Sequence, residues 1–107
     1  MSSLLRFPED FTWGTATASF QVEGGANERD RCIWDDFCRW PGKLFAGHTG
    51  DIADDHYHRY KDDVALMSGL GLTGYRFSIS WPRVLKGGVG EINQRGLDFY
   101  DRLVNTL

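Results

Sequence analysis

An amide and a carboxylate, Gln21 and Glu23, follow directly on a strand-like segment at residues 11–18. That segment alternates aromatic, small and hydroxylated residues, which is typical of a strand in a crowded interior. In a parallel barrel, the side chains just past the C-terminal ends of the strands form the active-site face. Because an amide donates and accepts hydrogen bonds at once, Gln21 suits a ligand rich in hydroxyl groups. From the residues alone, an interior amide that satisfies backbone groups is the favoured interpretation.

A second strand, predicted over residues 74–80, carries a charge on its polar face. Its two faces are Tyr75, Phe77 and Ile79 on one side, and Arg76, Ser78 and Ser80 on the other. On a half-exposed sheet the polar face meets water, whereas in a barrel covered by helices it points inward. An inward guanidinium is costly unless a carboxylate or several acceptors meet it, so in a barrel Arg76 is expected to have an acidic partner.

Helices are expected to hold these strands in place, in the order β–loop–α–β–loop–α of an α/β protein. A long connection over residues 22–53 leads to a helix predicted over residues 54–68, and a second helix begins near Asn93, whose side chain is expected to cap it. Trp13 is expected in the core. The predicted buried stripes are Tyr57, Tyr60, Val64 and Met67 on the first helix, and Leu97, Tyr100, Leu103, Val104 and Leu107 on the second.

The candidate metal ligands do not form a set. His56 and His58 are two positions apart and point to different sides of a helix. Cys32 and Cys38 lack the second pair of ligands that a zinc site needs. We therefore expect no metal, and two reduced thiols in a chain without an export signal.

Composition excludes several classes of protein. The net charge of −3, from 12 basic and 15 acidic residues, argues against a nucleic-acid partner. No apolar run approaches the roughly 18 residues that span a membrane, and the N-terminus lacks the apolar stretch of a secretory signal. A cytoplasmic location is the expectation.

Five segments carry a family resemblance, and they occur in the family's order along nearly the whole chain. They are residues 11–25, the Ile-Trp-Asp-Asp-Phe at 33–37, the run at 49–60, the Tyr-Arg-Phe-Ser-Ile-Ser-Trp-Pro-Arg at 75–83, and the Gly-Leu-Asp-Phe-Tyr at 96–100. Together they resemble the N-terminal portion of the family 1 glycoside hydrolases, the β-glucosidase family. The approach to Trp34 departs from the family pattern because it is shorter and lacks Gly and Pro.

The resemblance implies a (β/α)₈ TIM barrel, of which this chain would supply the first two β/α units. A complete barrel needs roughly 250 residues, so 107 residues are expected to be a fragment, a split-enzyme half or a truncation.

The resemblance also implies a retaining mechanism with two glutamates, acting on β-glycosides without a cofactor. The family's Asn-Glu-Pro and Glu-Asn-Gly contexts are absent, so both glutamates are expected outside this chain, which alone should be inactive. Gln21 would bind hydroxyl groups of the nonreducing sugar, and Arg76 would lie beside the missing nucleophile.

Other side chains are expected to support this site. Glu23 is expected to make structural hydrogen bonds, and Arg83 a salt bridge at the top of the barrel. Trp34 and Trp81 are either subsite platforms or core residues, and core packing is favoured for both.

Two further hypotheses stay open beside a glycosidase portion completed by the remaining barrel segments in cis or in trans. One is a noncatalytic barrel piece whose copies associate through open strand edges and apolar faces. The other is a separate sugar-binding module.

Overall fold

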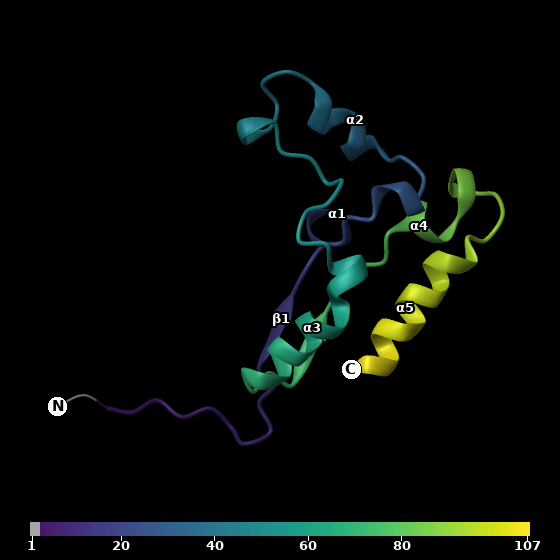
Figure 1. Ribbon diagram of the computed structural model, residues 1–107. Coiled ribbons are helices and arrows are strands. Elements are labelled where there is room, and N and C mark those ends of the chain that lie inside the picture. Colours follow the sequence, from purple (N-terminus) through teal and green to yellow (C-terminus); the bar gives the residue numbers. More distant parts are fainter. Residues whose placement is uncertain (1–2) are drawn as a thin grey trace.

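The computed structural model describes residues 3–107, which form several helices and a short parallel sheet (Figure 1). In chain order the strands and α-helices are β1 (Gly14–Ala16), α1 (Ser19–Val22), α2 (Ile33–Arg39), α3 (His56–Gly69), β2 (Gly74–Arg76), α4 (Trp81–Val84) and α5 (Gln94–Thr106). Short 3₁₀ turns lie at Ala26–Glu28, Phe45–Gly47 and Lys86–Gly88.

The sheet is parallel, and α3 makes the connection between its two strands. Gly14 pairs with Gly74 and Ala16 with Arg76, and the Thr17 backbone N–H donates to the Arg76 carbonyl at 3.0 Å. Both strands are shorter than the predicted 11–18 and 74–80. The strands are shorter than predicted because the alternation of side chains continues beyond the three residues of each strand that are paired by backbone hydrogen bonds.

The core lies where α3, α4 and α5 meet, and β2 packs against it. Its buried residues are Tyr57, Tyr60, Val64, Val84, Phe99, Tyr100 and Leu103, with Met67, Tyr75, Phe77 and Leu85 packed around them. The stripe predicted for the first helix is confirmed. On the predicted apolar face of the second strand, Tyr75 and Phe77 pack against this core, whereas Ile79 is 57% exposed.

The stripe predicted for the last helix is partly wrong. Phe99 is fully buried, while Leu97, Val104 and Leu107 are 39%, 56% and 57% exposed. The helix has apolar residues on two adjacent faces, and the face that contacts α3 and α4 is the one that contains Phe99 and Leu103. The Asn93 cap is also wrong: its side-chain amide donates to the Glu28 carbonyl at 3.3 Å instead of capping α5.

Trp13 is not a core residue in the described part of the chain. It is 48% exposed, and its ring packs against Phe7 and Phe11 with centroid distances of 4.7 and 4.8 Å. Trp13 precedes β1, so its ring joins the aromatic residues of the N-terminal segment rather than the helices.

The connection predicted over residues 22–53 contains α2 and two 3₁₀ turns rather than irregular chain alone. It folds back on itself closely at Gly24, where φ is +65° and a Cβ atom would lie 2.1 Å from the Ile52 carbonyl oxygen. The helix predicted over 54–68 begins at His56, because Asp55 adopts a left-handed conformation with φ of 54°. The favourable Asp55–Arg59 pair is present, at 3.8 Å.

A glycine permits the contact between α4 and α5. A Cβ atom at Gly96 would lie 2.0 Å from the Arg83 carbonyl oxygen, so Gly96→Ala forces the backbones apart. We expect a loss of about 1–3 kcal/mol in the free energy of unfolding, as for other overpacked sites, measured by urea denaturation. The matched control is Gly69→Ala in α3, where a Cβ atom meets nothing within 4 Å. Equal stability of the two variants would contradict the prediction.

Candidate functional site

The two residues predicted to serve a ligand lie at or just past the C-terminal ends of neighbouring strands. Gln21 lies in the single turn α1 that follows β1, and Arg76 is the last residue of β2. Both are exposed. Among residues 3–107, no carboxylate forms an ion pair with Arg76. Arg76 therefore remains available to an acidic group that this part of the chain does not supply.

Glu23, two residues after Gln21, is buried, and both of its carboxylate oxygens are engaged. It is 4% exposed. Arg83 Nε donates to Oε1 at 2.9 Å, and the Tyr100 hydroxyl donates to Oε2 at 2.5 Å. Burial, and then the negative charge of Glu23, hold the pKa of the Tyr100 hydroxyl well above its usual value, so the phenol stays protonated. This engagement leaves Glu23 a structural acceptor rather than a free acid.

Arg83 is fully buried, and each end of its guanidinium has a partner. Besides Glu23, Nη2 donates to the Gly24 carbonyl at 2.7 Å and Nη1 to the Gly25 carbonyl at 3.3 Å. The guanidinium carbon lies 4.2 Å from the centroid of the Tyr57 ring, a cation–π arrangement. A buried charge is tolerated when it is paired and hydrogen-bonded in this way. The predicted salt bridge of Arg83 is therefore present, and it holds the backbone that follows α1.

The two candidate tryptophan platforms are not buried, so the favoured expectation of core packing is wrong within residues 3–107. Trp34 is 51% and Trp81 59% exposed. Trp34 lies on the outer side of α2, because Asp35 and Cys38 are the residues of that helix that turn inward. Trp81 begins α4, and its indole N–H donates to the Gly88 carbonyl at 2.7 Å.

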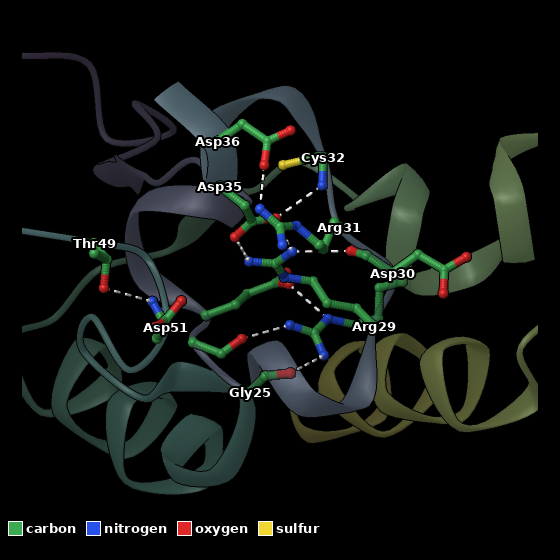
Figure 2. Close-up of polar contacts among 12 residues, drawn as sticks. Gly25, Arg29, Asp30, Arg31, Cys32, Asp35, Asp36, Thr49 and Asp51 are labelled. Carbon is green, nitrogen blue, oxygen red and sulfur yellow. Dashed lines mark hydrogen bonds and ion pairs between the residues drawn. The ribbon is translucent and has the colours of Figure 1, made fainter. Parts of the chain in front are cut away.

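A network of charges in the connection between β1 and α3 was missed by the sequence reasoning (Figure 2). Arg29 makes two hydrogen bonds to Asp35, at 2.7 and 2.9 Å, and these side chains are 5% and 4% exposed. Arg39 binds both oxygens of Asp51 at 2.9 Å and donates to the Asp35 carbonyl at 2.7 Å. The only signal in the sequence was the mixture of arginine and aspartate at residues 29–39.

This network borders a cavity of about 390 Å³, which is lined by Ala26, Asn27, Arg29, Arg31, Asp35, Arg39 and Asp51. Within this network, the hydrogen bond from Arg29 holds the pKa of the Asp35 carboxyl well below its usual value. Arg31 pairs with Asp36, so each guanidinium at the cavity has a carboxylate partner. The cavity therefore has no unpaired cation for an anionic ligand, and its charges fix the shape of the connection.

The histidines point to different sides of α3, as predicted from their spacing. His56 is buried and its Nδ1 lies 2.6 Å from Asp63, while His58 is exposed between Asp55 and Glu28. Residues 3–107 contain no group of three or more His, Cys, Asp or Glu placed to hold a metal ion. Within the same residues, no helix has the length and apolar character to cross a membrane.

His58 should titrate above its ordinary pKa. Its hydrogen bond to Asp55 at 2.6 Å, and then Glu28 at 3.2 Å, favour the charged ring and raise its pKa above 6.5. The stabilisation is therefore fully present below about pH 6.5 and lost as the pH rises through the native pKa. We expect an NMR titration of the ring to show this shift and Asp55→Asn to reduce it. Asp10→Asn, in the N-terminal segment, should leave the titration of His58 unchanged. A native pKa at or below 6.5 would contradict the prediction.

The parallel β1–α3–β2 unit, with polar side chains past the ends of its strands, is the arrangement of an α/β-barrel protein. The chain belongs to glycosyl hydrolase family 1, whose profile matches residues 4–107. The structure is the N-terminal part of the TIM barrel of that family, with two parallel strands.

Several relatives are β-glucosidases. The chain is 59% identical over 103 residues to thermostable β-glucosidase B of Thermobispora bispora, covering 96% of this chain and 22% of the relative. It is 54% identical to β-glucosidase A of Acetivibrio thermocellus, covering 98% and 24%. A solved β-glucosidase from Thermotoga maritima superposes with a TM-score of 0.88 at 52% identity, covering 94% of this chain and 24% of that one. The chain thus spans 22–24% of the length of these relatives.

Proposed function

We propose that this chain is the N-terminal portion of a retaining β-glycosidase that hydrolyses β-glucosides. The observation that carries the proposal is the family match along residues 4–107, with Gln21 and Arg76 in the family's motifs. Relatives that support it are named β-glucosidases. A further similar solved structure, 54% identical, is the virulence factor SghA in complex with its substrate analogue salicin.

The proposed chemistry divides the site between this chain and the remaining barrel. A retaining glycosidase uses two carboxyl groups about 5–5.5 Å apart, one as nucleophile and one as general acid and then base. The family's Asn-Glu-Pro and Glu-Asn-Gly contexts are absent from this sequence, and Glu23 is engaged with Arg83 and Tyr100. Both catalytic glutamates therefore come from the remaining barrel. Arg76 lowers the pKa of the nucleophile by favouring its ionised form, and Gln21 binds hydroxyl groups of the sugar.

The test joins this chain to the segment of Thermotoga maritima β-glucosidase A that lies beyond the matched region; we call this protein the completed barrel. We expect the completed barrel to hydrolyse an aryl β-glucoside and the 107-residue chain alone to be inactive. The remaining segment by itself is the control. A completed barrel that folds, as judged by its circular dichroism, but hydrolyses no β-glycoside would reject the proposal.

Self-association is the second candidate, and exposed apolar side chains favour it. Ile79, Leu97 and Val104 are 57%, 39% and 56% exposed, and exposed apolar surface of this kind promotes association. Sedimentation of the chain at several times its 12.2 kDa mass would support this candidate. A sugar-dependent chemical shift at Gln21 in a monomer would instead support a sugar-binding module.

A further inference from the structure

The hydroxyl group of Tyr100 joins the segments that follow the two strands. It donates to Glu23 Oε2 at 2.5 Å and accepts from the Ser80 backbone N–H at 2.7 Å. A phenol has one proton and free lone pairs, so both bonds form at the same time. Glu23 directly follows the α1 turn, and Ser80 directly precedes α4. One atom on α5 therefore holds both strand-end segments.

The α1 turn depends on such contacts for its position. It contains four residues, none of them buried, and a helix of this length is not stable by itself. The Ser19 backbone N–H donates to Ser78 Oγ at 2.8 Å. At the other end the Glu23 N–H donates to the Ser19 carbonyl at 2.9 Å, and the Glu23 carbonyl accepts from the Tyr57 N–H at 2.9 Å. Glu23 is thus the fixed point on the C-terminal side of Gln21.

We propose that Tyr100 is a positioning residue for Gln21. Its hydroxyl holds the Glu23 carboxylate, and Glu23 fixes the α1 turn so that the Gln21 side chain meets the sugar hydroxyl groups. Tyr100 is 6% exposed and acts through Glu23 rather than by touching the substrate. This inference rests on the proposed function, because the role of Gln21 is defined by the glycoside.

Tyr100→Phe in the completed barrel removes the hydroxyl and keeps the ring that stacks on Phe77. We expect kcat/KM for an aryl β-glucoside to fall tenfold or more. The matched control is Tyr60→Phe, a buried tyrosine of α3 outside the Glu23 network, which should change kcat/KM less than twofold. Both variants are assayed well below their melting temperatures, so that a small loss of stability does not contribute.

A double-mutant cycle separates positioning from general destabilisation. If Tyr100 acts through Gln21, Tyr100→Phe should lower kcat/KM less than threefold in a Gln21→Ala background. Equal falls in the two backgrounds, or no fall in the single variant, would overturn the inference.

A second measurement does not depend on activity. In Tyr100→Phe, the backbone N–H groups of Gln21 and Glu23 should exchange with solvent faster than in Tyr60→Phe, because the α1 turn loses its support. Unchanged exchange would overturn the inference even in an active enzyme. Inactivity of the unsubstituted completed barrel would instead reject the proposed function, and the exchange measurement would then decide the role of Tyr100 alone.

Discussion

Replacing Arg76 with methionine in the completed barrel should lower kcat/KM for an aryl β-glucoside by about 30- to 5000-fold. Removing one partner of a buried charge pair costs about 2–5 kcal/mol, and each 1.36 kcal/mol corresponds to a factor of about ten in rate. The nucleophile also loses the cation that lowers its pKa. Its pKa therefore rises, and the acidic limb of the pH profile of kcat/KM moves to higher pH.

The pH profile distinguishes this role from a simple loss of folding. Arg102→Met, on the exposed side of α5, is the matched control and should change neither kcat/KM nor the acidic limb. Arg76→Lys keeps the positive charge but loses the planar guanidinium with its paired N–H donors. Its kcat/KM should therefore lie between that of Arg76→Met and that of the unsubstituted completed barrel. An Arg76→Met enzyme with reduced rate and an unchanged acidic limb would contradict an electrostatic role.

Periodicity predicted the helices well where one face of the helix was apolar. Tyr57, Tyr60 and Val64 lie on one face of α3, and all three are buried. The last helix has apolar side chains on two faces, and spacing alone does not say which face meets α3 and α4. The predicted stripe therefore does not contain Phe99, which is fully buried.

The site was predictable in its residue types but not in its pairings. Arg83 was expected in a salt bridge, yet its partner Glu23 lies 60 residues away, a separation that no local pattern reports. The Arg29–Asp35 pair is six residues apart and crosses from a loop into α2, so helical spacing rules did not apply. Family motifs singled out Gln21 and Arg76, whereas the buried network of Glu23, Arg83 and Tyr100 became visible only in the fold.

The largest loss of stability should come from Arg83. Arg83→Met leaves the Glu23 carboxylate buried without its cation, and removing one partner of a buried ion pair costs about 3–5 kcal/mol. We expect a fall of that size in the free energy of unfolding. Urea denaturation monitored by tryptophan fluorescence measures it.

The double variant Glu23→Leu/Arg83→Met should be more stable than Arg83→Met alone, because no buried charge is left without a partner. It should not reach the stability of the unsubstituted protein, since the Gly24 carbonyl and the Tyr100 hydroxyl still lose their partners. If Arg83→Met unfolds at the same urea concentration as the unsubstituted protein, the Glu23–Arg83 pair does not hold the segment that follows β1. In that case the position of Gln21 would have to depend on other contacts.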